Sequence, residues 1–235
     1  MASFRNKLKH LRSFDHKASE VAFLLGGIGT GNVSIGARGQ LRDWEIFNKP
    51  GKGNKFPYSL FAIHIDDGKQ KYNRALEAAV QPPHSLSHGF DSGDAAGLPR
   101  FKESVFRGEY PLATVDLIDD RLPVSVSMEA FTPFIPLNAD DSSFPVAVIR
   151  YYVKNIAEQS LQVSVAGSLA NMTTFNGYGP FNYPIYAGET VNKLVHEGHL
   201  HGILMESVGF PDNHPMRCSM SISTSNPQYT AKPTW

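Results

Sequence analysis

Short segments in which apolar and polar residues alternate recur along most of this chain, and they restrict its fold more than any other feature. In PVSVSMEAF (123–131) every second residue is apolar, so Glu129 is expected on the solvent-facing side of a half-buried strand. The same period of two, or a run of β-branched residues, occurs in segments 58–66, 146–155, 161–169, 199–206 and 216–224. These segments predict a chain built mainly from β-strands.

The segments between these strands favour an all-β protein, a large antiparallel β-sandwich with long loops and at most short helices. Sixteen prolines and twenty glycines are spread through the chain and disfavour long helices. Only 73–80 and part of the N-terminal tail are expected to form short helices. Residues 81–100 have the composition of a long loop, and 151–165 are expected to form two antiparallel strands joined by a polar turn.

Length and charge exclude several classes of protein. We expect a tail over residues 1–20 and one sandwich domain over 21–235, which is a common size for a large all-β domain. Twenty-two basic and twenty-two acidic side chains cancel, which gives no electrostatic reason to expect nucleic acid as a partner. The start of the chain lacks the apolar stretch of a signal peptide, and no run has the length of a membrane span, so a cytoplasmic location is expected.

The glycine-rich stretch VAFLLGGIGTGNVSIGARGQ (21–40) resembles a strand followed by a phosphate-binding loop. In a G-x-G-x-x-G fingerprint that starts at Gly27 or Gly29, the third glycine would fall on Asn32 or Ser34, and no Gly-Lys-Ser/Thr follows. The next residues predict another strand, so no helix N-terminus is available for a phosphate. We therefore expect these glycines to serve backbone geometry, through positive φ angles and close backbone approach.

The same stretch also opens an ordered series of motifs, in which the segment Gly26 to Gly31 is followed by Arg38-Gly39 and by Arg42, Trp44, Ile46 and Asn48. This order resembles the opening of glycoside hydrolase family 116, the non-lysosomal glucosylceramidase and bacterial β-glucosidase type, although Leu24 stands where the family usually has proline. Further matches cover most of the rest of the chain: GLPRF (97–101), FRGEYPLATVDL (106–117), 127–148 and VSVAGSL (163–169).

The resemblance implies an enzyme of two parts, an N-terminal β-sandwich and a C-terminal (α/α)₆ barrel that carries the catalytic carboxylates. Nothing in this chain resembles the barrel, so we predict no catalytic residue here. A retaining glycosidase needs two carboxyl groups about 5–5.5 Å apart. The sequence alone does not show that any two of the available glutamates lie this close. These glutamates are Glu45, Glu103, Glu109, Glu129 and Glu206.

The best candidates for function inside the chain are Arg42, Asp43, Trp44 and Asn48, as contacts to the barrel domain or to a sugar. An exposed Trp44 would suit either role, whereas a buried Trp44 beside a surface ion pair would be structural. The segment 171–184, rich in asparagine and aromatic residues, is typical of a carbohydrate surface and equally of a partly packed loop.

Metal and cofactor sites are not predicted. His196, His199 and His201 lie close in sequence, and the last two are expected to share a strand face, but a metal would need a third converging ligand. The acidic run 138–143 lacks the glycine and glutamate of a calcium loop, so a turn between strands is expected. The lone Cys218 excludes an internal disulfide and is expected to pack within a strand.

Two functions follow as hypotheses. The first is a non-catalytic sandwich that supports and orients the catalytic barrel of a β-glucosidase or glucosylceramidase; it requires a large apolar patch on the isolated domain. The second is a free-standing carbohydrate-binding module, with a β-glucoside as the possible ligand. A third possibility, an independent enzyme, would need glucoside hydrolysis by this chain alone.

Overall fold

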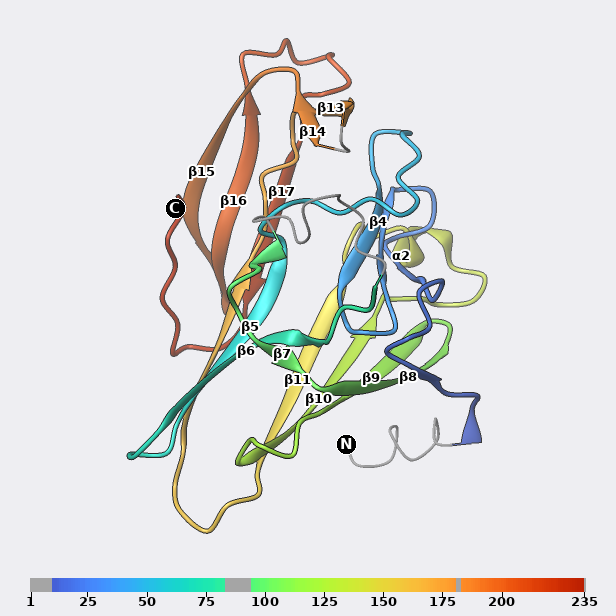
Figure 1. Cartoon of the computed structure of the whole chain (residues 1–235). Helices are drawn as coiled ribbons and strands as arrows, with labels where there is room; N and C mark the ends of the chain where they lie inside the picture. The colour runs from blue at the N-terminus through green and yellow to red at the C-terminus, as the bar shows by residue number, and fades with distance from the viewer. Residues whose placement is uncertain (1–9, 83–93, 181–182, 235) are drawn as a thin grey trace. The chain divides into compact units, whose positions relative to one another are not determined.

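The computed structural model describes residues 10–82, 94–180 and 183–234 of the chain (Figure 1). They belong to two compact units, unit 1 over Met1–Ser168 and unit 2 over Leu169–Trp235, and each is described by itself. Within these ranges the regular secondary structure consists of β-strands and one short helix, so the all-β fold class is confirmed. One sandwich domain over 21–235 stays a prediction.

The described residues of unit 1 form three sheets. The largest is antiparallel, with the order β1 (Phe14–Asp15), β8 (Glu103–Glu109), β9 (Leu112–Ile118), β10 (Val124–Phe131) and β11 (Val148–Asn155). The second has the order β12 (Gln162–Ser168), β5 (Leu60–Asp66), β6 (Lys71–Ala78) and β7 (Arg100–Phe101), and only β6 and β7 run parallel. The third consists of β2 (Phe23–Leu25), β3 (Asn32–Ile35) and β4 (Leu41–Glu45).

The core of unit 1 lies where β6 packs against β8 and β9. Its fully buried side chains come from both large sheets and include Ile63, Ile65, Leu76, Val115 and Met128. An ion pair also joins the two sheets, since Nε of Arg74 on β6 lies 3.0 Å from Oδ2 of Asp119, just after β9. Buried apolar positions of β5, β6, β9 and β10 therefore form the interior. The apolar positions of β12 do not take part, since Val163 and Val165 are 39% and 46% exposed.

Unit 2 is a smaller antiparallel arrangement. A two-stranded sheet of β13 (Phe175–Tyr178) and β14 (Pro184–Tyr186) precedes a three-stranded meander of β15 (Glu189–Glu197), β16 (Leu200–Val208) and β17 (Ser219–Thr224). Met172, Phe175 and Met205 are buried. Cys218 is half-buried just before β17, and its Sγ lies 3.3 Å from the carbonyl oxygen of Thr173.

The alternating segments form strands as predicted: β5, β10, β11, β12, β16 and β17 lie within or overlap the expected ranges. The prediction of a helix over 73–80 is wrong, because most of this segment belongs to β6. Residues 75–78 are all buried, so this part of β6 is covered on both faces and has no period of two. The helix expected in the tail falls largely on residues 1–9, outside the described ranges.

The predicted pairing within 151–165 is also wrong. β11 pairs with β10 in one sheet, whereas β12 pairs with β5 in another. The polar connection between them therefore carries the chain from one sheet to the next. A polar connection between two sheets has the same local sequence features as a hairpin turn. The sequence near the turn therefore does not show which strand each of the two strands pairs with.

Three smaller expectations can be compared with the structure. Glu129 is only 6% exposed, which contradicts its expected solvent-facing position; the side chain of Tyr152 on β11 lies against it, and the Tyr152 hydroxyl donates to its Oε2 at 2.8 Å. The acidic run contains the short helix α2 (Ala139–Ser142), capped by the side chain of Asn138. Of the long loop expected at 81–100, residues 83–93 lie outside the described ranges.

The predicted absence of a membrane span can be checked for helices. No helix in the described ranges has the length and apolar character needed to cross a bilayer.

Candidate functional site

The glycine-rich segment forms the connection between β2 and β3, and it is fixed to the chain around α2. The backbone N–H of Gly26 donates to Oγ1 of Thr132 at 2.8 Å, and that of Ile28 donates to the Ser142 carbonyl at 2.9 Å. A Cβ on Gly27 would collide with the backbone of Ser143 and Phe144. The loop is therefore anchored by backbone contacts that side chains would block.

The backbone roles expected for these glycines are confirmed. Gly26, Gly29 and Gly31 have φ angles of 137°, 74° and 75°, and Gly27 provides the close approach. The next residues continue into β3, with Val33 and Ile35 buried. No helix follows the loop, so the arrangement lacks the row of free amides that binds a phosphate.

Trp44 lies in the interior of unit 1. Its side chain packs edge-on against Phe56, with ring centroids 5.8 Å apart, and the residue is only 8% exposed. Gly51 packs so closely that a Cβ there would collide with the Trp44 carbonyl. This is the buried alternative for Trp44, and it removes the exposed ring on which a stacked sugar would depend.

Asp43 and Arg42 hold the segment that follows β4. Asp43 is 1% exposed, and its Oδ1 accepts the Gly53 N–H at 2.7 Å and the Arg42 Nε–H at 3.1 Å. The N–H of Asp43 donates to the Asn54 carbonyl at 2.8 Å, and Arg42 also donates to the carbonyl of Ser19. Both side chains are engaged within unit 1. Whether they also act at a domain interface stays a prediction.

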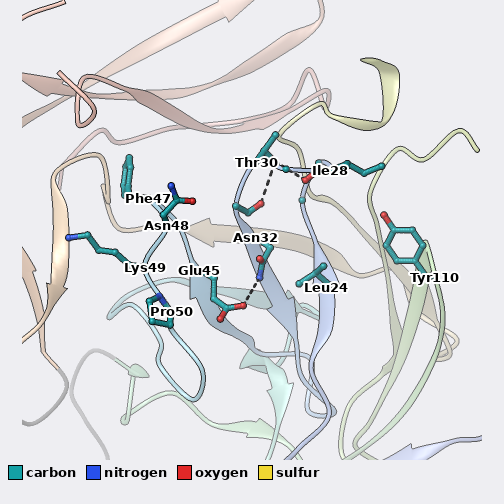
Figure 2. A pocket seen from close by; sticks show the side chains of 14 residues that line it. Leu24, Ile28, Thr30, Asn32, Glu45, Phe47, Asn48, Lys49, Pro50 and Tyr110 are labelled. Carbon is teal, nitrogen blue, oxygen red and sulfur yellow. Dashed lines mark hydrogen bonds between the residues drawn. The ribbon is translucent and has the colours of Figure 1, made fainter. Parts of the chain in front are cut away.

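Beside this strand lies a pocket of about 710 Å³, which we call the glycine-loop pocket. Figure 2 shows Phe47, Asn48, Lys49 and Pro50 along one side, Leu24, Ile28 and Tyr110 on the other, and Asn32 and Glu45 between them. Its wall is completed by Gly26, Gly27, Gly29, Thr30 and Gly31. Of the four predicted site residues, only Asn48 lines the pocket.

Glu45 is the acidic residue of the pocket wall, and two neighbours hold its carboxylate. Nζ of Lys52 donates to Oε2 at 2.9 Å, and the Asn32 amide donates to the same oxygen at 3.3 Å. The hydrogen bond from Lys52 has the largest effect and lowers the pKa of Glu45; burial opposes it, and a weaker hydrogen bond from Asn32 adds to the lowering. Glu45 is therefore an ionised acceptor at neutral pH.

The chain turns sharply after Glu45. Phe47 and Asn48 have φ angles of 56° and 54°, two consecutive non-glycine residues in the left-handed region. Phe47 is half-buried and Asn48 is exposed. This conformation is unfavourable for most side chains, although asparagine tolerates it better than phenylalanine. It places both residues on the pocket wall.

The pocket does not contain the carboxylate pair of a retaining glycosidase. Among its lining residues, Glu45 alone carries a carboxyl group, whereas that chemistry needs a nucleophile and an acid about 5–5.5 Å apart. Sequence reasoning named Glu45 only as one of several glutamates, because nothing local marks the approach of Asn32 and Lys52.

The histidines of unit 2 differ from the expectation. His199 lies in the turn between β15 and β16, and it is His196 that faces His201 across the strands, with Nδ1 atoms 2.5 Å apart. His201 also stacks on Tyr229. In the described ranges, no group of three histidine, cysteine or acidic side chains is placed to hold a metal ion.

The segment 171–184 is partly packed. Met172, Thr173, Thr174 and Phe175 are buried, while Asn176 is exposed. Residues 181–182 lie outside the described ranges. A carbohydrate surface in this segment stays a prediction.

A comparison with protein families identifies the family of this chain. Residues 22–235 match the family described as beta-glucosidase 2, glycosyl-hydrolase family 116 N-term.

Proposed function

The chain belongs to the N-terminal domain family of glycoside hydrolase family 116, and from this premise we propose that it is the non-catalytic part of a β-glucosidase or glucosylceramidase. In this role it supports and orients a C-terminal catalytic barrel of (α/α)₆ architecture. Because the family is defined as an N-terminal domain, a companion catalytic domain is expected in its members.

The observation that carries this proposal is a set of large apolar side chains exposed beside the glycine loop. Phe144, for example, is 58% exposed. We call the set the loop-side apolar surface; it consists of Leu24, Ile28, Tyr110, Phe134, Ile135, Leu137 and Phe144. Gathered apolar side chains of this size are typical of a surface that another protein part covers.

These side chains come from segments that contact one another. Ile28 is joined to the end of α2 by its N–H bond to the Ser142 carbonyl, and Phe144 follows two residues later. The rings of Tyr110 and Phe134 meet edge-on with centroids 5.2 Å apart. The apolar side chains are therefore gathered around one part of unit 1, as a docking surface requires.

A binding experiment tests the proposal. The catalytic part of a family 116 β-glucosidase, expressed separately, should bind the 235-residue chain and gain glucosidase activity or thermal stability from it. Phe144→Ser should weaken this association at least about tenfold, since an exposed phenylalanine that becomes buried contributes roughly 1.5–3 kcal/mol.

The matched control is Ile156→Ser. Ile156 is 60% exposed in the same unit but lies in the connection between β11 and β12, away from the loop-side apolar surface. The proposal is wrong if the catalytic part does not bind, or if both variants weaken binding equally. As an independent check, the DNA after codon 235 should encode, in frame, a helical region with two suitably placed acidic residues.

A further inference from the structure

The glycine-loop pocket has the size of a ligand site and adjoins the loop-side apolar surface, with which it shares Leu24, Ile28 and Tyr110. Its volume of about 710 Å³ is in the usual range for small-molecule sites, roughly 300–1,000 Å³. Three separate parts of the chain form it: the β2–β3 loop, the segment 45–50 and the β8–β9 turn. We propose that this pocket binds a neutral sugar residue.

The charges of the pocket favour a neutral ligand. Its wall contains one carboxylate, Glu45, and one ammonium group, Lys49. The Glu45 carboxylate is already compensated by Lys52 at 2.9 Å, so it attracts a cation weakly and repels an anion weakly. Because neither sign of charge gains much here, binding in this pocket depends on hydrogen bonds and apolar contacts, which a neutral ligand can make.

The polar groups suit hydroxyls. The ionised Glu45 carboxylate accepts hydrogen bonds from hydroxyl groups, and the Asn48 amide both donates and accepts. Glu45 is oriented by Asn32 at 3.3 Å, as Figure 2 shows, so its position does not depend on the ligand. A planar carboxylate or amide group can form hydrogen bonds with two hydroxyl groups on adjacent ring carbons of a sugar.

Apolar groups lie opposite and beside these polar groups. Phe47 and Pro50 lie on one side of the pocket and Tyr110 on the other. A sugar ring has C–H faces as well as hydroxyls, so it can contact both kinds of wall. A Cβ at Gly29 would meet nothing within 4 Å, so there is open space beside the loop backbone at this position.

The backbone at Phe47 and Asn48 gives independent support. Two consecutive left-handed residues other than glycine are unfavourable, and such conformations persist mainly at functional sites. Here the strained pair lies on the wall of the pocket, directly after the carboxylate.

Ligand binding to the 235-residue chain tests the inference. Methyl β-glucoside and cellobiose are the probes, followed by saturation-transfer NMR and calorimetry; their choice rests on the proposed function. Glu45→Gln removes the charge while keeping the shape, and Asn48→Gly removes the amide while tolerating the positive φ. Each should raise the dissociation constant at least about tenfold, as expected for hydrogen bonds to a charged or well-placed group.

The matched control is Asp66→Asn. Like Glu45, Asp66 is a carboxylate paired with a lysine. The side chain of Asp66 is 25% exposed and that of Glu45 is 24% exposed, but Asp66 does not line the pocket. Glucoside binding that is lost in the two pocket variants and kept in Asp66→Asn supports the inference. It is overturned if neither probe binds, or if Glu45→Gln binds as tightly as the unmodified chain. The docking experiment uses Phe144, which does not line the pocket, so the two proposals can fail separately.

Discussion

Replacement of Asp43 tests whether this buried residue holds in place the segment that leads from β4 to Phe56. Three substitutions separate its contributions. Asp43→Asn keeps an acceptor oxygen and a side chain that tolerates φ = 52°, Asp43→Gly removes the side chain but suits the same φ, and Asp43→Ala removes the side chain and is strained. The comparison therefore distinguishes hydrogen bonding from backbone conformation.

The magnitudes follow from the contacts. The side chain accepts the Gly53 N–H at 2.7 Å and the Arg42 Nε–H at 3.1 Å while it is almost fully buried. Hydrogen bonds to a charged group contribute roughly 1.5–3 kcal/mol, so Asp43→Gly should destabilise unit 1 by about 2 kcal/mol. Asp43→Ala should add about 1 kcal/mol for the left-handed backbone, giving about 3 kcal/mol. Asp43→Asn should lose only about 1 kcal/mol, because the acceptor remains.

Urea unfolding, followed by far-UV circular dichroism and by tryptophan fluorescence, measures these differences. The slope of the unfolding free energy with urea should be the same for all four proteins, so that the midpoints report stability. Equal stability of the alanine and glycine variants would refute the backbone contribution. An asparagine variant as unstable as the alanine variant would refute the role assigned to the acceptor oxygen.

Two further predictions concern other parts of unit 1. Gly27→Ala should destabilise unit 1 by about 1–3 kcal/mol in the same assay, because the new Cβ would collide with the backbone of Ser143 and Phe144. Gly97→Ala is the control and should have little effect, since nothing lies within 4 Å of its new Cβ. Equal losses of stability in the two variants would contradict the close approach at Gly27. Burial alone would raise the pKa of Asp119, but hydrogen bonds from Arg121 and Arg74 outweigh it and lower the pKa to about 2. This carboxylate therefore contributes up to about 2 kcal/mol that is present above about pH 4 and is lost as the pH falls towards 2. Asp119→Asn should remove this part of the acid sensitivity in urea titrations between pH 2 and 5; an unchanged pH profile would show that the pair does not contribute.

The strands could be predicted where one face is buried and the other is wet. β5 is an example, since Ile63 and Ile65 are buried between half-buried neighbours, and adjacent residues show this alternation in the sequence. β6 could not be predicted in this way. Its buried run Ala75 to Ala78 is covered on both faces, and its alanine, leucine and glutamate residues favour a helix by intrinsic propensity. The tertiary environment overrode that preference.

The candidate site was predictable only in part. Glycine spacing excluded a phosphate loop and indicated backbone roles, both of which depend on local conformation. The position of Trp44 could not be predicted, because burial depends on Phe56 and Gly51. The importance of Glu45 was equally hidden, since its amide partner lies thirteen residues away on another strand.

By itself, the sequence determined that this chain would form short strands and glycine turns, and its ordered motifs indicated the family. Only the tertiary structure decided that β11 and β12 enter different sheets, that Glu129 is buried, and that Asn32, Glu45 and Asn48 lie around one pocket. The physical reason is the range of the interactions. Backbone conformation and side-chain alternation are set by adjacent residues, whereas burial, pairing and charge environment depend on segments that meet only after folding.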